Sequence, residues 1–129
     1  MACPYFLPDR PLEGPRPARA PLSDVFGGTC GIAGPVPERS ILVDFCNFGY
    51  ASSHCERFPA AANCDALRFS ARNLGADNVE VTYVREKDWT PIESGKLIYA
   101  RAAQTLTPVP ADAALARQSL AFAARFPIS

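Results

Sequence analysis

The sequence predicts a small α+β protein with two unlike halves, and three observations support this prediction. Residues 1–37 contain eight of the thirteen prolines and five of the eight glycines, which disfavours long regular elements. From Ala66 onward, apolar and polar residues alternate with the period of β-strands. Residues 111–126 are rich in alanine and place apolar side chains at helical spacing. We therefore expect an irregular Pro/Gly-rich N-terminal arm and a short helix around a four-cysteine site, a three-stranded antiparallel meander and a C-terminal helix.

Length and charge restrict the number of domains, the partners and the compartment that we expect. The chain has 129 residues, 48% of them hydrophobic, and a formal net charge of zero. We expect a single domain over 1–129, with the arm and short helix in 1–65 and the sheet and last helix in 66–129. The absence of a basic excess argues against nucleic acid and anionic membranes as partners. No apolar run approaches the roughly 20 residues of a membrane span, and the start has no secretory signal pattern, so we expect a cytoplasmic protein.

The N-terminal arm is predicted to be ordered. Disordered segments are poor in large apolar side chains, whereas this arm carries Tyr5, Phe6 and Phe26 among others. We expect extended and turn conformations that lie across the rest of the protein. The glycines of 27–31 predict a tight turn that lets the thiolate of Cys30 approach a ligand closely.

A short helix is predicted to begin at Pro37. Proline fits the first helical turn, and the acidic Glu38 suits the helix dipole. Gly49 provides a C-terminal stop, which puts Cys46 in the last turn. A short strand over 41–45 is the alternative. The apolar stripe that favours the helix consists of Ile41, Leu42, Phe45 and Phe48.

The second half is predicted to form three strands, over 66–72, 79–84 and 96–101. Short connections favour an antiparallel meander, with a second turn or loop at 88–95. Arg68 or Arg72 is expected to pair with Glu80 across neighbouring strands, although exposed pairs contribute little to stability. The aromatic residues of the C-terminal helix are expected to pack on this sheet.

The five cysteines predict a metal centre. Cytoplasmic thiols stay reduced, and the odd number argues against structural disulfides. No Cys-x-x-Cys is present, so a zinc site would be atypical. Cys3-Pro4 is compatible with iron–sulfur ligation, and dispersed thiolates can each donate to one cluster. Cys64 is expected to be a free thiol. The other four precede the break at Phe58-Pro59, and we predict them as cofactor-binding ligands to the irons of a 4Fe-4S cluster: Cys3, Cys30, Cys46 and Cys55.

The predicted role of this centre is electron transfer, with a redox enzyme or complex as the protein partner. Backbone amides around Gly28, Gly31 and Asn47 are expected to donate hydrogen bonds to the sulfurs. His54, the only histidine, is either a ligand in place of a cysteine or a surface residue near the site. The sequence has no recognisable nucleophile–base pair or phosphate-binding loop, so an enzyme is the less favoured interpretation.

Other interpretations of the cysteines stay open at this point. A structural zinc site would make the chain a protein-interaction module, because zinc is redox-silent. Disulfides would form if the chain reached an oxidising compartment. A thiol redox sensor would use Cys64 and one other cysteine as a switchable disulfide. A cysteine can also be only a small buried hydrophobe, which is the interpretation we favour for Cys64.

Part of the pattern is shared with other proteins. The chain resembles a group of small uncharacterised bacterial proteins of similar length, so the likeness covers most of it. Cys64 lies outside the shared pattern. The group has no established activity, and the resemblance therefore implies no function, catalytic residue or partner. The shared residues are Cys3-Pro4-x-Phe6, Cys30, Cys46-Asn47-x-Gly49-Tyr50-Ala51, Cys55-x-Arg57-Phe58-Pro59 and Leu67-Arg68-Phe69.

Overall fold

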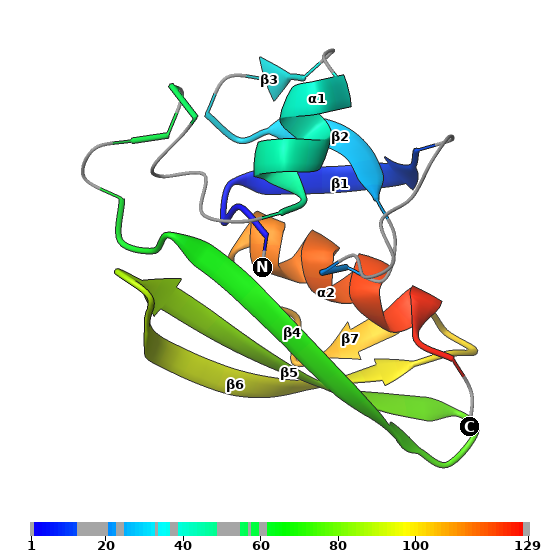
Figure 1. Ribbon diagram of the computed structural model, residues 1–129. Coiled ribbons are helices and arrows are strands. Elements are labelled where there is room, and N and C mark those ends of the chain that lie inside the picture. Colours follow the sequence, from blue (N-terminus) through cyan, green and yellow to red (C-terminus); the bar gives the residue numbers. More distant parts are fainter. Residues whose placement is uncertain are drawn as a thin grey trace.

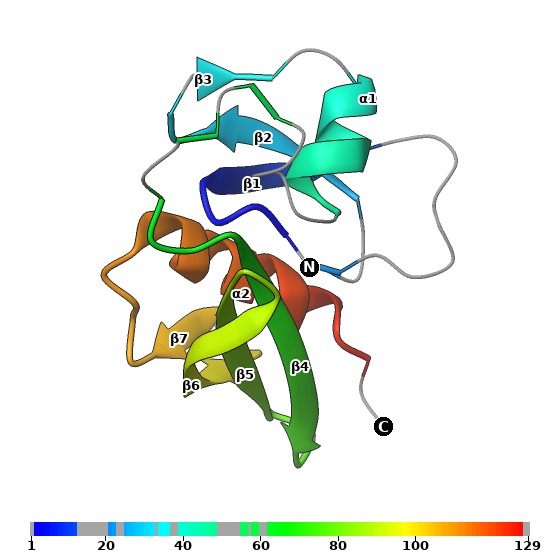
Figure 2. The ribbon, with the colours of Figure 1, turned by 60° about the vertical axis from the view of Figure 1, so that its left-hand side comes forward.

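The computed structural model describes residues 2–12, 21–22, 25–32, 34–36, 39–48, 55–56, 58–59 and 62–127. They form two antiparallel sheets, with strand orders β1-β2-β3 and β4-β5-β6-β7. Helix α2 lies between the two sheets (Figure 1, Figure 2). The predicted α+β class is confirmed. In chain order the elements are β1 (Phe6–Pro11), β2 (Phe26–Cys30), β3 (Gly34–Pro35), α1 (Arg39–Ile41), η1 (Leu42–Cys46), β4 (Ala66–Leu74), β5 (Asn78–Lys87), β6 (Thr90–Ala100), β7 (Thr105–Thr107) and α2 (Ala113–Arg125).

The larger sheet follows the alternation read from the sequence. Val79 and Val81 on β5 and Leu97 on β6 are buried, and they belong to the main hydrophobic core. Their neighbours along each strand point away from that core, as the period of a strand requires. On the outer face the guanidinium of Arg72 lies 2.8 Å from the carboxylate of Glu80, which confirms the predicted cross-strand pair.

Two features of this sheet differ from the prediction. The loop expected at 88–95 is wrong, because Asp88 and Trp89 alone form the turn, with φ of 51° and 63°. Strand β6 continues through Pro91, which pairs with β5 at a register shift. Strand β7 pairs only with residues 98–100 of β6. On the side of β6 that faces away from β5, no described strand therefore requires a hydrogen bond from residue 91, where proline has no N–H to donate. The meander therefore has four strands, and the last is too short for its alternation to be read from the sequence.

Helix α2 confirms the predicted C-terminal helix. The carboxylate of Asp112 caps it by accepting hydrogen bonds from the amides of Ala114 and Leu115 at 2.9 and 3.3 Å. Phe122 stacks on Phe69 of the larger sheet with ring centroids 5.7 Å apart. The opposite side of the helix contacts β1, so α2 packs against both sheets. Within the described ranges, no helix has the length and apolar character needed to cross a membrane.

The smaller sheet corrects the prediction of an irregular arm. Strand β1 pairs with β2, and β2 pairs with β3. Gly28 is not in a turn, because it lies in β2, where an added Cβ would sit 2.0 Å from the carbonyl oxygen of Leu7. Glycine is needed there for close approach of two strands, and the turn falls instead at Gly31 and Ile32. Prolines 8 and 11 are tolerated because β1 is an edge strand.

The short helix is present but irregular. Its first turn, α1, continues as the π-helical segment η1, which ends with Cys46, as the sequence predicted. The alternative of a strand over 41–45 is wrong. The predicted start at Pro37 and Glu38 and the predicted stop at Gly49 lie outside the described residues.

Asn47 ties the end of η1 to the smaller sheet. Its fully buried side chain accepts a hydrogen bond from the amide of Phe26 at 2.9 Å and donates to the carbonyl of Phe26 at 2.9 Å. It also donates to the carbonyl of Leu42 at 2.8 Å. The carboxamide therefore binds both main-chain polar groups of Phe26, as a neighbouring strand would, and it fixes the position of Cys46 relative to β2.

We predict that Asn47→Ala lowers the free energy of unfolding by about 2 to 4 kcal/mol, because it leaves buried backbone groups of Phe26 and Leu42 without partners. Chemical denaturation monitored by circular dichroism measures this change. Asn63→Ala is the matched control, since Asn63 is exposed, and it should change the unfolding free energy little. Equal stabilities of the two variants would contradict this role for Asn47.

Candidate metal centre

Four cysteines that are distant in sequence line one small cavity of about 20 Å³. It lies where the turn at residues 4–5, the end of β2 and the segment α1–η1 meet. Cys46 and Cys3 are buried, while Cys30 and Cys55 are partly exposed. Among the described residues, the other side chains that line this cavity are all apolar. The described lining residues are Cys3, Phe6, Cys30, Val36, Ile41, Phe45, Cys46 and Cys55.

Main-chain hydrogen bonds bring the first of these cysteines to the cavity. Ala2 forms an antiparallel bridge with Leu67 of β4, which anchors the start of the chain on the larger sheet. The amide of Cys3 then donates to the carbonyl of Cys46 at 3.1 Å. The buried side chain of Gln118 donates to the carbonyl of Cys3 at 2.8 Å. Cys3 is thus held by the larger sheet, by η1 and by α2 together.

Two of the thiols accept hydrogen bonds from the amide two residues later. The amide of Ile32 donates to the sulfur of Cys30 at 3.4 Å. The Tyr5 amide donates to Cys3 in the same way. Two of the three amides predicted from the sequence to bind sulfur have other acceptors: the amide of Gly31 donates to the carbonyl of Tyr5, and that of Asn47 donates to the carbonyl of Leu42. Amide donors on a sulfur favour the thiolate form and tune a metal centre that binds it.

The four thiols influence one another electrostatically. The pKa of Cys3 is raised to about 12, mainly because the thiol is buried. The Tyr5 amide lowers this pKa, whereas the nearby Cys46, Cys30 and Cys55 raise it further. Four thiolates cannot share such a cavity without a cation, because like charges in an apolar setting repel strongly. In the metal-free protein Cys3 is therefore a neutral thiol.

The thiols do not converge on a single point. In the described ranges, no group of three or more His, Cys, Asp or Glu side chains is arranged to hold one metal ion. The five cysteines are free thiols rather than disulfides. The described part of the chain therefore holds no compact four-cysteine cluster, and the four sulfurs are instead distributed around the walls of their cavity.

Cys64 lies apart from these four. It lines a different cavity of about 420 Å³, together with Arg85 and Asp112. Its buried thiol donates a hydrogen bond to the carbonyl of Ala66 at 3.2 Å, and burial raises its pKa. His54, the other candidate ligand, lies outside the described residues.

Sequence reasoning missed the two polar side chains, Asn47 and Gln118, that hold the segments around the thiol cavity in place. Gln118 lies three residues after Leu115 and four before Phe122, so it occupies the apolar face of its helix. Asn47 directly follows a predicted ligand and is buried. A polar residue at a position where the pattern requires an apolar one is the signal that could have identified Gln118.

Comparisons with known proteins identify no relative: no family model, no curated protein and no solved structure matches the chain. The geometry of the site is therefore the basis for proposing a function.

We predict that iodoacetamide labels Cys30 and Cys55 of the metal-free protein before Cys3, Cys46 and Cys64, because the latter three are buried. Peptide mapping by mass spectrometry gives the order. Because burial raises the pKa of Cys64, its labelling rate should still increase above about pH 9.5, where a thiol with the ordinary pKa of about 8.5 is already mostly ionised. Equal labelling rates for all five thiols would contradict the burial described above.

Proposed function

We propose that this protein binds an iron–sulfur cluster of the 4Fe-4S type through Cys3, Cys30, Cys46 and Cys55, and that it transfers electrons within a larger redox complex. One observation supports the proposal: four cysteines from separate segments line a single cavity, and the other described residues that line it are apolar. Thiolates are the ligands that iron–sulfur clusters use, and an apolar shell limits access of solvent to such a centre.

The distribution of the thiols favours a cluster over a single zinc ion. Structural zinc requires four ligands directed at one point. The described residues contain no such group. A cubane has an iron at each of four corners, so each thiolate approaches from its own side. Thiols spread around the walls of one cavity suit that arrangement better.

The size of the cavity implies that its walls move apart when a metal centre is bound. A volume of about 20 Å³ holds roughly one water molecule, which is less than a cluster occupies. The walls belong to short elements, β2 and α1–η1, that carry few residues each. Metal binding coupled to adjustment of the surrounding chain is common for thiolate sites.

The exposed edge of the cavity is where a protein partner would approach. Cys30 and Cys55 are partly exposed, whereas Cys3 and Cys46 are buried. Ile32, whose amide contacts the sulfur of Cys30, is 51% exposed. An apolar side chain next to a partly exposed ligand suits a docking surface for a redox partner, because it can be buried on association.

The direct experiment is a visible absorption spectrum of protein purified without air, with iron, sulfide and zinc assayed on the same sample. A cubane cluster gives broad absorption at about 400 nm with about four irons and four sulfides per chain. A colourless protein with zinc would support an interaction module in place of an electron carrier. A colourless, metal-free and folded protein would rule out both metal proposals.

We predict that Cys46→Ser and Cys3→Ser abolish or strongly reduce bound iron, because each removes a ligand. Cys64→Ser is the matched control and should retain the iron and sulfide of the parent chain, since Cys64 lines a different cavity. Iron and sulfide assays after reconstitution measure the effect, and circular dichroism checks that each variant folds. Retention of iron by both ligand variants, or its loss from Cys64→Ser, would contradict the assignment.

A further inference from the structure

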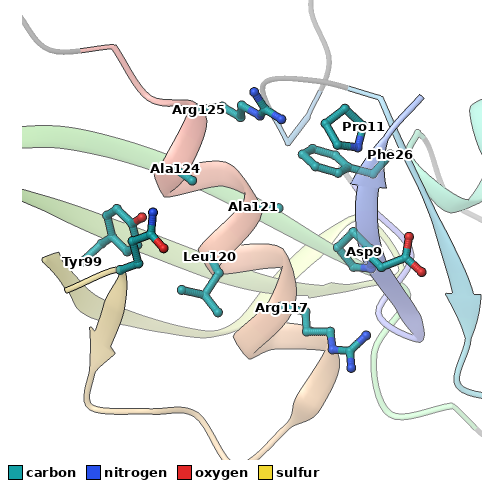
Figure 3. A pocket seen from close by; sticks show the side chains of 11 residues that line it. Asp9, Pro11, Phe26, Tyr99, Arg117, Leu120, Ala121, Ala124 and Arg125 are labelled. Carbon is teal, nitrogen blue, oxygen red and sulfur yellow. The ribbon is translucent and has the colours of Figure 1, made fainter. Parts of the chain in front are cut away.

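Strand β2 borders two hollows of the molecule, one at each of its ends. Phe26, its first residue, lines a groove of about 650 Å³ beside α2, together with Ala121 and Ala124 (Figure 3). Cys30, its last residue, lines the cavity of the four thiols. No cysteine is among the described residues that line the groove, so of these two hollows only the cavity offers thiols to a reagent.

Three contacts around Tyr5 bring Cys30 and Cys55 to the same place. The amide of Gly31, directly after Cys30, donates to the carbonyl of Tyr5 at 2.8 Å. The ring of Tyr5 packs edge-on against that of Phe58, with the two centroids 5.5 Å apart. The amide of Phe58 in turn donates to the carbonyl of Cys55 at 3.1 Å. Tyr5 therefore holds together the segments that carry these two cysteines, and no metal ion takes part in these contacts.

The thiol cavity is small enough for a bond to form across it. Its volume of about 20 Å³ holds roughly one water molecule, so the atoms of its walls are only a few ångströms apart. Rotation of two cysteine side chains, with a small movement of the walls, then brings their sulfurs to bonding distance.

Accessibility selects one pair of the four thiols. Cys30 and Cys55 are partly exposed, whereas Cys3 and Cys46 are buried. A small neutral oxidant such as hydrogen peroxide therefore reaches the first pair from solvent before it reaches the second, and the susceptibility of a thiol to oxidation follows its exposure.

We propose that Cys30 and Cys55 form a reversible disulfide when the metal-free chain meets a peroxide. One thiol reduces hydrogen peroxide and becomes a sulfenic acid, with release of one water molecule. The other thiol condenses with this sulfenic acid, which forms the S–S bond and releases a second water molecule. The two thiols together lose two electrons and two protons. A dithiol reductant reverses the reaction, and the proposal does not depend on the iron–sulfur cluster.

The test treats the full chain, freed of metal with a chelator, with hydrogen peroxide and maps its disulfides by mass spectrometry without reduction. We expect a bond between Cys30 and Cys55 as the main product, with loss of two of the five free thiols and their recovery in dithiothreitol. Cys30→Ser and Cys55→Ser should each prevent this loss. Cys64→Ser is the matched control and should form the bond as the parent chain does, because Cys64 is buried and lines a different cavity.

A second pair of variants tests the role of Tyr5. Tyr5→Ala removes the ring that packs on Phe58 and should slow formation of the bond severalfold, whereas Tyr5→Phe keeps the ring and should not. Circular dichroism checks that each variant folds. The proposal is overturned if peroxide leaves Cys30 and Cys55 as thiols, if the main disulfide joins other cysteines, or if oxidation stops at acids that dithiothreitol does not reverse. Equal rates for Tyr5→Ala and Tyr5→Phe would contradict the part assigned to Tyr5.

Discussion

The docking of the short N-terminal sheet onto helix α2 holds in place the segments that carry Cys3 and Cys30. Strands β1, β2 and β3 have six, five and two residues, and a sheet this small is not stable without a packing partner. Gln118 supplies a specific part of that contact. Its carboxamide donates to the carbonyls of Cys3 and Phe6, both at 2.8 Å, from a fully buried position. The bridge between Ala2 and Leu67 adds a second tie to the larger sheet.

This docking explains how three of the four thiols come to line one cavity. Cys3 follows the bridge to β4, and Cys30 pairs with Phe6 across the smaller sheet. Cys46 is fixed at the end of η1, where the neighbouring Asn47 binds the main chain of Phe26. None of these ties involves a thiol side chain. The polypeptide can therefore bring the thiols close together before a metal binds, although the cavity remains narrow.

The apolar surroundings have an energetic consequence for the thiols. Burial favours the neutral form of Cys3, and its thiol neighbours oppose its ionisation further. Metal binding removes protons from such thiols and supplies the compensating positive charge. We infer that the smaller sheet gains more stability from metal than the larger sheet does, because the smaller sheet and η1 contribute most of the cavity walls.

The sequence predicted the larger sheet and α2 well because both show regular periodicity. It failed on the smaller sheet, where prolines and glycines were interpreted as breakers. Gly28 is needed there for the close approach of β1, and Pro8 and Pro11 lie on an edge strand. The grouping of the cysteines was expected from composition and compartment, but the roles of Asn47 and Gln118 were not. Their contacts join segments that are 21 and more than 100 residues apart, so these contacts cannot be predicted from local sequence patterns.

We propose that metal binding at the four thiols stabilises the smaller sheet and η1 selectively. Amide hydrogen exchange, compared between the metal-free chain and the chain reconstituted with iron and sulfide, tests it most directly. We expect slower exchange in β1, β2 and η1 on metal binding, with exchange in β4, β5 and β6 little changed. Identical exchange in the two forms, or protection confined to the larger sheet, would contradict it.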